Sequence, residues 1–588
     1  MAAKKADFNK LAERLHMDPV IIRILRNRDL FTEEEMDSFL HGTLDKLHDP
    51  HSLKDAKKAA LILKDKIQAQ KKIRIIGDYD VDGICSTYIL YKGLLTCKAQ
   101  VDAQIPHRIK DGYGINEALM EQAYADGVDT ILTCDNGIAA KKELELGKEK
   151  GMTCIVTDHH EVPFTEEDGQ KKQILPNVDA IVDPKQEDCS YPFPSICGAV
   201  VAYKVIQLLF EVFDVPADTV CKVQRELLEL AGIATVCDIM PLRDENRILV
   251  KTALEYLKDS HNPGIRALIA VNELDASHIS SFSIGFVLGP CINATGRLDS
   301  AKLSLELLQA ESFEEAVPLA TSLKEYNENR KAMTEKGVEE AMEQIDSGIY
   351  DKDRILVLYL ENAHESLAGI IAGRVRERTG KPTFVLTKAE EGIKGSARSI
   401  EAYNVYEEMT KCSHLFTKFG GHKMAAGLSL PKENVEKFRT LMNDNCTLTE
   451  EDFEEKILID VPMPMSYVNH ELLNQLSLLE PFGNANEKPV FAQKDVIFLK
   501  AVLMGKKKNM ARITVMDENG QRFELVLFRD LDRLEECLNR KYGKDTAQSL
   551  YSEQGIKQGD VKMDIIYYPS LNEFRGRTSI QYQLQDFR

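Results

Sequence analysis

Three short apolar runs, each ending in an acidic turn and followed by a helical pattern, constrain the fold of this chain more than any other feature. The aspartates that open these turns are Asp78, Asp135 and Asp158. Short apolar strands that alternate with helices are typical of a parallel sheet. A further apolar run over 180–182 predicts another strand of the same sheet. The helices expected beside these strands cover 84–95, 139–150, 198–213 and 220–235.

The rest of the chain changes pattern several times, which predicts several domains. Residues 311–345 favour a long helix that joins two domains, although a broken pair of helices fits equally well. A second α/β pattern starts near Arg354, and the strand-rich pattern from Lys456 is typical of a small barrel or sandwich. We expect a helical segment over 1–50, domains over 51–305, 349–450 and 455–588, and a connecting helix over 306–348.

The composition limits the classes of partner and compartment. The net charge of −19 does not favour nucleic-acid binding unless a local basic patch exists. The twelve cysteines form no Cys-x-x-Cys pair, so a zinc ribbon is not expected. The first residues show no secretion signal and no run is apolar enough to span a membrane, so we expect reduced thiols, a cytoplasmic protein and no membrane partner.

Carboxylates and imidazoles gather directly after the predicted strands. Three acids alternate in Asp78-Tyr79-Asp80-Val81-Asp82-Gly83, and Asp158-His159-His160 follows a later strand. Ligands of an open parallel sheet bind at the carboxyl ends of its strands. Carboxylates crowded there require cations, and carboxylates with imidazoles suit Mn²⁺ or Mg²⁺ better than structural zinc. The pattern therefore predicts metal-assisted hydrolysis of a phosphoester.

Each of these residues also has a plainer interpretation. An aspartate after a strand is usually a helix N-cap, and Asp135 before Asn136-Gly137 suits a turn. A pair of histidines is more often a surface or core feature than a ligand pair. The joint pattern favours a site over these separate interpretations.

The same motifs, followed by Asp238, resemble the DHH phosphoesterase superfamily and, within it, the RecJ family of single-strand-specific exonucleases. The resemblance runs over about residues 50–500. Further stretches that carry it are Tyr191-Pro192-Phe193 with Cys197-Gly198-Ala199, Glu245-Asn246-Arg247, Leu288-Gly289-Pro290, Ile292-Asn293-Ala294 with Gly296-Arg297-Leu298, Gly420-Gly421-His422 with Ala425-Ala426-Gly427, and Pro481-Phe482-Gly483.

The resemblance implies a metal cluster that holds one or two Mn²⁺ or Mg²⁺ ions. The implied ligands are Asp78, Asp80, Asp135, His159 and Asp238. Asp135 would bridge the ions, and His160 would contact the scissile phosphate or protonate the leaving oxygen. Small-substrate relatives carry a metal-binding histidine where this chain has Arg74, and we expect Asp82 to compensate.

The resemblance also implies a second domain that binds the substrate. The implied residues are Asn293, Arg297, His364, Arg374, Ser396, Arg398, Ser399, Gly420, Gly421 and His422. Residues 365–427 hold ten Lys or Arg and seven Asp or Glu, so this segment is locally basic. The Gly-Gly-His turn would let the backbone approach a phosphate, and the alternative is a tight turn with a capping histidine.

One departure from the family pattern concerns the substrate. The family usually has Pro-Arg-Ile-Asn where this chain has Pro290-Cys291-Ile292-Asn293. A cation is thus missing at Cys291. We expect Arg297 to replace it, or the activity to be weaker.

The C-terminal region resembles an OB-fold, a small barrel that binds single strands through basic and aromatic side chains. Phe491 and Phe498 are expected to offer stacking. The alternative is that the lysines form a solvated hairpin tip. The basic residues expected to contact nucleic acid are Lys506, Lys507, Lys508 and Arg512.

The leading hypothesis is an α/β multidomain, metal-dependent exonuclease that degrades single-stranded DNA from 5′ to 3′ into mononucleotides in DNA repair and recombination. A helicase and a single-strand-binding protein are partners that the family suggests. One alternative is a DHH phosphodiesterase for short oligonucleotides or cyclic dinucleotides. Another is a non-catalytic replication or repair scaffold.

Overall fold

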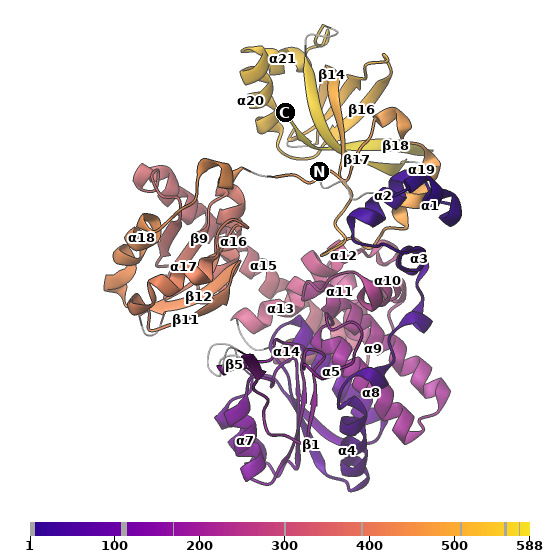
Figure 1. Cartoon of the computed structure of the whole chain (residues 1–588), viewed down its shortest axis with the longest axis vertical. Coiled ribbons are helices and arrows are strands. Elements are labelled where there is room, and N and C mark those ends of the chain that lie inside the picture. Colours follow the sequence, from indigo (N-terminus) through magenta and orange to yellow (C-terminus); the bar gives the residue numbers. More distant parts are fainter. Residues whose placement is uncertain are drawn as a thin grey trace. The chain divides into compact units, whose positions relative to one another are not determined.

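The computed structural model describes residues 6–106, 114–167, 170–298, 301–389, 392–454, 456–505, 508–557, 561–574 and 577–588. The chain forms two compact units (Figure 1). Unit 1 comprises Met1–Leu47, Pro241–Lys251 and Ile457–Arg588. Unit 2 comprises His48–Met240 and Thr252–Lys456.

Unit 2 begins with a parallel sheet whose strand order is β2-β1-β3-β4-β7. Its strands are β1 (Lys72–Ile76), β2 (Gln100–Gln104), β3 (Thr130–Cys134), β4 (Thr153–Thr157) and β7 (Ala180–Val182). The chain moves from β1 to β2 on one side and then to β3 on the other, so the strand order reverses at β1. Ligands of such sheets bind outside the carboxyl ends of the strands at this reversal.

Helices cover both faces of this sheet. Figure 1 shows α7 on one side and α4 and α8 on the other. Helix α8 is buried along most of its length because its sequence is apolar on nearly every side, and it packs against α4 and α5. The helices and the small hairpin of this region are α4 (Ala56–Gln68), α5 (Val81–Thr96), α6 (Glu117–Ala125), α7 (Lys141–Glu149), α8 (Gly198–Phe213), α9 (Ala217–Cys237), β5 (Phe164–Glu167) and β6 (Gln170–Gln173).

A long helix leads from the first sheet to a second one. Helix α15 (Phe313–Gln344) is a single helix of 32 residues that begins at the N-cap Ser312, which confirms the connecting helix and excludes a broken pair. It packs against α11, α13 and α14 at one end and against α16 at the other. The preceding helices are α10 (Asp244–Leu257), α11 (Pro263–Val271), α12 (Ser281–Ser283), the π-helix η4 (Ile284–Leu288), α13 (Gly289–Leu298) and α14 (Lys302–Gln309).

The second sheet of unit 2 is mixed, with the order β11-β12-β10-β9-β8. Apolar side chains fill both of its faces, one beneath α15 and α16 and the other beneath α17 and α18. The elements are β8 (Leu356–Leu360), β9 (Thr383–Lys388), β10 (Ile393–Arg398), β11 (Lys418–His422), β12 (Ala425–Leu430), α16 (Ala368–Thr379), α17 (Val405–Lys411) and α18 (Val435–Asp444).

Unit 1 is built on a β-barrel. Its strands follow the order β13-β14-β15-β16-β18-β17, and the pairing of β14 with β17 closes the barrel. These elements are β13 (Val461–Pro462), β14 (Phe491–Met504), β15 (Met510–Met516), β16 (Arg522–Leu527), β17 (Lys562–Phe574), β18 (Arg577–Phe587), α19 (His470–Ser477), α20 (Leu531–Tyr542) and α21 (Thr546–Tyr551). The closed barrel confirms the expected OB-type fold.

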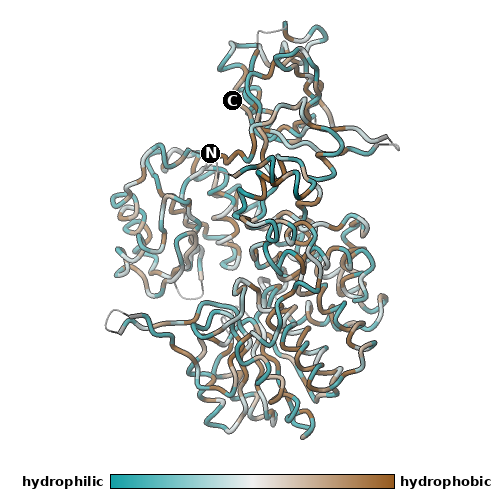
Figure 2. Tube along the Cα trace, turned by 45° about the vertical axis from the view of Figure 1, so that its right-hand side comes forward, coloured by the Kyte–Doolittle hydropathy of each residue, from teal (hydrophilic) through white to brown (hydrophobic). Residues whose placement is uncertain are grey.

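The N-terminal helices belong to the same core as the barrel. Ile22 and Leu25 of α2 share one apolar cluster with Phe491 and Tyr567 of the barrel. Figure 2 shows the apolar stretches of these strands and helices in brown. The helices are α1 (Phe8–Leu15), α2 (Pro19–Asn27) and α3 (Glu33–His41). Shorter helical turns of the chain are η1 (Leu44–Lys46), η2 (Pro50–Ser52), η3 (Ala276–His278), η5 (Ile345–Ile349), η6 (Glu365–Leu367), η7 (Ser413–Leu415), η8 (Lys432–Asn434), η9 (Glu450–Phe453) and η10 (Met465–Tyr467).

A buried arginine joins the three segments of unit 1. Arg247 is 1% exposed, and its guanidinium lies 3.8 Å from the centre of the Phe39 ring. Its Nε and Nη atoms donate to four backbone oxygens at 2.6–3.0 Å, those of Phe39, Leu478, Leu479 and Glu480. The motif that contains Arg247 is therefore a structural anchor of unit 1.

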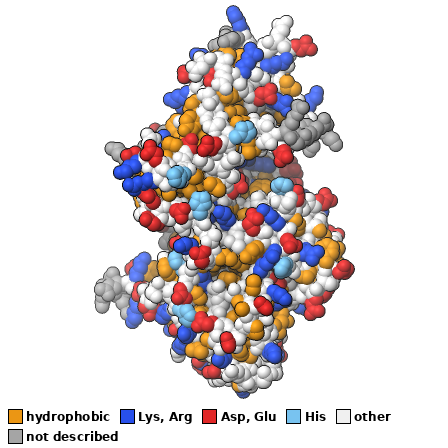
Figure 3. Space-filling view, turned by 90° about the vertical axis from the view of Figure 1, so that its right-hand side faces the viewer, with side chains coloured by type: hydrophobic (Ala, Val, Ile, Leu, Met, Phe, Trp, Pro, Cys, Tyr) orange, Lys and Arg blue, Asp and Glu red, His pale blue; other side chains and the backbone are white. Residues whose placement is uncertain are grey.

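No helix among the described residues is long and apolar enough to cross a membrane. On the face drawn in Figure 3, acidic and basic side chains of the described residues are interspersed. The face drawn there therefore carries no extended patch of a single charge among the described residues.

Candidate metal centre

The predicted metal ligands meet at the carboxyl ends of β1, β3 and β4. Asp78, Asp80 and Asp82 lie on the turn from β1 into α5, and Asp135 follows β3. His159 follows β4, and Asp238 is the C-cap residue of α9. The structure thus brings together residues that are up to 160 positions apart in the sequence.

Local backbone bonds shape the turns that carry these side chains. Asp80 is the N-cap of α5 and accepts a hydrogen bond from the Gly83 amide at 3.0 Å. Asp135 adopts a left-handed backbone with φ of 58°, and its amide donates to the Thr157 oxygen at 3.1 Å. The Asn136 side-chain amide donates to the Ile76 oxygen at 3.2 Å and so ties the turn to β1. Asp80 therefore has both its plain role as a cap and a place in the acidic cluster.

His159 lies among three carboxylates. Its Nε2 atom is 3.1 Å from Asp135 Oδ1, 3.5 Å from Asp82 Oδ2 and 3.7 Å from Asp238 Oδ2. Sets of three side chains whose ligand atoms lie within 4.8 Å of one another are Asp135 with His159 and His160, Asp82 with His159 and Asp238, and Asp78 with Asp80 and Asp135. Asp135 and His159 each belong to two of these sets, so these two residues join the three sets into one cluster.

The electrostatics of the cluster fit a divalent cation. Burial and the neighbouring Asp82 raise the pKa of Asp80, and burial with several neighbouring carboxylates raises the pKa of Asp135 far more strongly. Burial, Asp82 and Asp80 raise the pKa of Asp238 to about 8. Cations among such carboxylates remove this repulsion. Carboxylate oxygens and an imidazole nitrogen are suitable ligands for Mn²⁺, and Mg²⁺ is also bound mainly by carboxylate oxygens.

Asp82 and Arg74 have structural partners. The two oxygens of Asp82 accept hydrogen bonds from the amides of Gly198 and Ala199 at 2.7 and 2.8 Å, at the start of α8. The Arg74 guanidinium pairs with Asp102 at 2.7 Å and with Asp126 at 2.8 Å. Asp82 therefore anchors α8 to the cluster, while Arg74 is engaged by acids outside the predicted ligand set.

Asp158 orients the histidine pair, a role that the sequence did not reveal. Its Oδ1 atom lies 2.7 Å from His160 Nδ1 and accepts the His159 amide at 2.8 Å, while Oδ2 accepts the Ile138 amide at 2.9 Å. Although burial opposes the charged imidazole, the bond to Asp158 raises the pKa of His160 to about 9. The His160 side chain is 44% exposed, so it can meet a substrate. The sequence feature that could have indicated this role is the position of Asp158 as the first residue of the Asp-His-His motif.

We expect Gly198→Ala to disturb the metal centre without touching the substrate. A Cβ atom at Gly198 would lie 2.9 Å from Asp135 Cβ and 3.1 Å from its Cα, so the Asp135 backbone must shift. Such overpacking costs about 1–3 kcal/mol of free energy. Because the strain falls on Asp135, we expect it to weaken the affinity for Mn²⁺ roughly 10- to 100-fold, which calorimetry can measure.

The matched control for this prediction is Gly285→Ala in the same unit. Its Cβ would meet only Val236, at an ordinary contact distance of 3.7 Å. Equal affinities for Mn²⁺ in the two variants would contradict the crowding at Asp135.

Part of the predicted substrate set gathers near the start of α16. Arg398 donates through Nη1 to Ser396 Oγ at 3.2 Å, and a Cβ at Gly369 would lie 2.9 Å from Arg398 Nη2. His364 is the N-cap of η6 and accepts the Ser366 amide. Arg374 is exposed on α16. These side chains provide cationic and hydrogen-bonding groups on one sheet and its helix.

The Gly-Gly-His segment forms the end of β11, and Lys423 and Met424 form the turn that leads into β12. Gly421 has φ of 152°, and a Cβ there would lie 2.4 Å from the Ala425 oxygen. His422 Nδ1 accepts the Met424 amide at 3.3 Å. His422 thus caps the turn that follows the glycines, and Gly420 and His422 are both exposed.

Three other predicted substrate residues differ from this group. Ser399 is 1% exposed and donates to the Tyr403 oxygen at 2.6 Å, which is a structural bond. Asn293 lies on α13, and its buried Oδ1 has no hydrogen-bond partner among the described residues. The side chain of Arg297 lies outside the described residues.

The predicted aromatic contacts of the barrel are wrong. Phe491 and Phe498 are both 0% exposed because they fill the barrel core, so they cannot stack on bases. Lys508 and Arg512 are exposed, and Arg512 lies 3.9 Å from Glu524. Lys506 and Lys507 lie outside the described residues.

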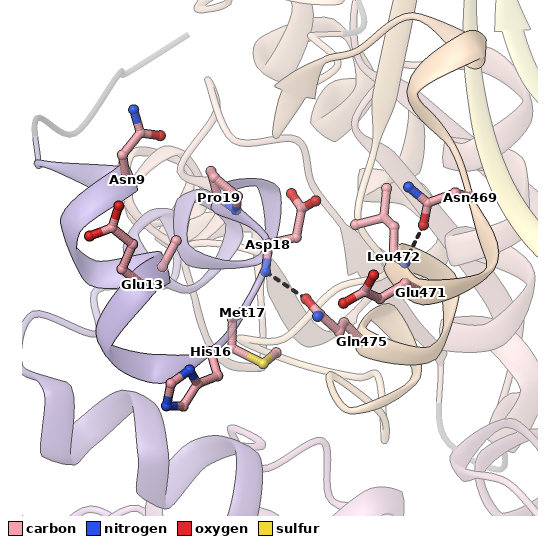
Figure 4. A pocket seen from close by; sticks show the side chains of 11 residues that line it. Asn9, Glu13, His16, Met17, Asp18, Pro19, Asn469, Glu471, Leu472 and Gln475 are labelled. Atoms are coloured by element: carbon pink, nitrogen blue, oxygen red, sulfur yellow. Dashed lines mark hydrogen bonds between the residues drawn. The ribbon is translucent and has the colours of Figure 1, made fainter.

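A pocket in unit 1 has a different chemistry from the metal centre. Figure 4 shows it between α1, α2 and α19, with Glu13, Asp18 and Glu471 on its wall. The Asp18 amide donates to Gln475 Oε1 at 2.6 Å across this pocket. Its acidic lining does not suit a phosphate backbone.

The first sheet carries acids and imidazoles where its strand order reverses, and the second sheet carries arginines and histidines. Together these features define the class of metal-dependent phosphoesterases. Sequence comparison narrows this class. Residues 72–235 match the DHH family, N-terminal domain, residues 352–447 match the DHHA1 domain, and residues 459–586 match the RecJ OB domain. The chain belongs to the RecJ family.

Individual relatives agree with this assignment. The chain is 35% identical over 581 residues to the single-stranded-DNA-specific exonuclease RecJ of Bacillus subtilis, an alignment that covers 98% of this chain and 69% of the relative. A crystal structure of RecJ from Thermus thermophilus in complex with Mn²⁺ shares the fold, with a TM-score of 0.77, 24% identity and coverage of 99% of this chain and 77% of that one. A manganese-bound exonuclease RecJ is 29% identical, with a TM-score of 0.58 and coverage of 70% and 98%.

Proposed function

We propose that this protein is a metal-dependent exonuclease that degrades single-stranded DNA from the 5′ end and releases mononucleotides. The observation that carries the proposal is the cluster of aspartates and histidines that meets at Asp135. Membership of the RecJ family supports the substrate, since the relatives bear the name of single-stranded-DNA-specific exonucleases. The polarity and the products follow from the resemblance in the sequence and await measurement.

We propose that Asp78, Asp80, Asp135, His159 and Asp238 hold one or two Mn²⁺ or Mg²⁺ ions, with Asp82 at the edge of the set. A bound ion supplies a Lewis acid that activates water and offsets phosphate charge. The ligand residues contribute their fixed positions, which the turns after β1, β3 and β4 impose.

The other residues of the site have separate tasks. His160, which Asp158 orients, contacts the scissile phosphate and donates a proton to the leaving oxygen. Arg374, Ser396, Arg398 and His422 bind phosphates of the strand. Cationic groups that follow the backbone are a common means of binding single strands without sequence preference.

The test is purified protein with Mn²⁺ on a 40-mer of single-stranded DNA that is labelled at either end. A blunt duplex and a dinucleotide are run beside it, and EDTA is the metal-free control. We expect stepwise loss from the 5′ end of the single strand, and no reaction with EDTA. Turnover of the dinucleotide alone would instead indicate a small-substrate phosphodiesterase, and inertness with bound Mn²⁺ would indicate a scaffold.

We also propose a role in repair and recombination in the cytoplasm, with a helicase and a single-strand-binding protein as partners. An exonuclease limited to single strands needs a source of them, which supports the helicase. The twelve cysteines are all free, which suits a reducing compartment. Degradation of duplex DNA only when a helicase is added would test this partnership.

A further inference from the structure

Cys291 occupies the position where a cation is missing from the family pattern, and its surroundings connect it to an arginine on another helix. Cys291 is fully buried on α13. Its Sγ atom donates to Asn272 Oδ1 at 3.7 Å and accepts from Asn327 Nδ2 at 3.4 Å. These bonds orient the Asn327 amide so that its oxygen faces away from the thiol.

Asn327 uses that oxygen to hold Arg330. Both residues lie on α15, and Asn327 is 2% exposed. Arg330 donates to Asn327 Oδ1 through Nε at 3.2 Å and through Nη2 at 2.9 Å. One edge of the guanidinium is therefore fixed, while its Nη1 end forms no hydrogen bond with the described residues.

Arg330 lies on α15, which packs against the helix that carries Arg374. It forms no ion pair with a carboxylate of the described residues, and burial followed by the charge of Arg374 lowers its pKa. Arg374 likewise lacks an ion pair in the part of the chain that the structure describes. Arg374 lies on α16, which packs against α15, and a phosphate that binds both guanidiniums would offset their mutual repulsion.

Helix α13 connects this arginine pair to the metal centre. A Cβ at Gly296 would lie 2.6 Å from the Tyr79 oxygen, within the turn that carries Asp78 and Asp80. Gly296 and Cys291 are five residues apart, which is about 7.5 Å along the helix axis. One helix thus contacts the metal-binding turn at one end and the Asn327–Arg330 pair near the other (Figure 1).

We propose that Arg330 binds a phosphate of the DNA strand together with Arg374, and that Asn327 is its positioning residue. The inference rests on the proposed function, because it takes single-stranded DNA as the ligand. It assigns the missing cation of position 291 to α15, where Asn327 bonds both Cys291 and Arg330. Arg297 is then not required for this task.

The test measures the affinity for a fluorescent 20-mer of single-stranded DNA at several salt concentrations. Binding is measured in the Asp135→Ala background, so that no strand is cut. Arg330→Gln is expected to weaken binding roughly tenfold or more, as the loss of a charged hydrogen bond predicts. The slope of log Kd against log salt should fall by about 0.7, the value for one phosphate contact on a single strand.

Two further variants separate charge from packing. Arg330→Lys keeps the charge, so it should keep the wild-type slope even if the affinity falls. Lys336→Gln removes an exposed charge from the same helix and should leave the slope unchanged. An Arg330→Gln variant with a lower melting temperature and an unchanged slope would overturn the inference, because Arg330 would then serve only packing.

Different experimental results would refute the proposed function and the proposed phosphate site. If the wild-type protein degrades the single strand from its 5′ end while the slope of Arg330→Gln is unchanged, only the phosphate site is refuted. If the wild-type protein does not degrade the strand, the proposed function is refuted, and the salt slope still decides whether Arg330 contacts DNA.

Discussion

Asp135→Ala is expected to abolish DNA cleavage while the protein continues to bind single-stranded DNA. Asp135 belongs to two of the three groups that can hold a cation, so its loss removes a ligand from both. Metal ions contribute several kcal/mol to charge stabilisation in such reactions, which corresponds to a fall in kcat of about 10³-fold or more. Binding should be equal or tighter, because a carboxylate that repels phosphate has been removed.

The measurement is single-turnover cleavage of an end-labelled 40-mer, with Mn²⁺ binding followed by calorimetry on the same samples. Asp259→Ala is the matched control in unit 2, because the side chain of this aspartate is 89% exposed and its carboxylate lies 4.0 Å from Arg225. Cleavage by Asp135→Ala at the wild-type rate would show that the acidic cluster is not the catalytic site.

Arg247→Met is expected to destabilise unit 1 by about 3–5 kcal/mol. The methionine would fill part of the space but would remove the guanidinium donor from the backbone oxygens of Phe39, Leu478 and Glu480, while the Leu479 oxygen would keep the Asn486 amide. Each unsatisfied group of this kind costs about 1–3 kcal/mol, and part of that cost is recovered by relaxation. The C-terminal end of α19, which the Leu478 and Glu480 carbonyls follow, would also lose a compensating positive charge.

Urea denaturation followed by tyrosine fluorescence measures this change. Arg14→Met is the matched control in the same unit, because Arg14 forms an exposed ion pair with Glu33. Exposed pairs of this kind contribute about 0–1 kcal/mol. Similar midpoints for the two variants would contradict the anchoring role of Arg247.

The strands of the first sheet were predictable because their sequences are apolar and bounded by turns. The exception is β2, whose sequence Gln-Val-Asp-Ala-Gln is polar. It lies at the edge of the sheet and is only partly buried, so packing imposes little apolar pattern on it. Edge strands of this kind are recognisable only when their neighbour is known.

In the barrel, the strands were predicted from the sequence, but the orientation of their side chains was not. The strand-rich pattern predicted the strands, whereas the expected stacking by Phe491 and Phe498 came from the resemblance to an OB-fold. Alternation assigns residues to two faces, but only closure of the barrel decides which face becomes the core. Both phenylalanines lie inside, together with side chains of α2 from the other end of the chain.

The sequence alone determined the parallel sheet, the acidic turns that follow its strands and the family, because these depend on local periodicity and on motifs of adjacent residues. The tertiary structure decided which distant side chains meet. It placed Asp158 against His160, Asp82 against the start of α8, and Asn327 between Cys291 and Arg330. Such contacts arise where helices and strands from separate parts of the chain pack together, and no local pattern records that packing.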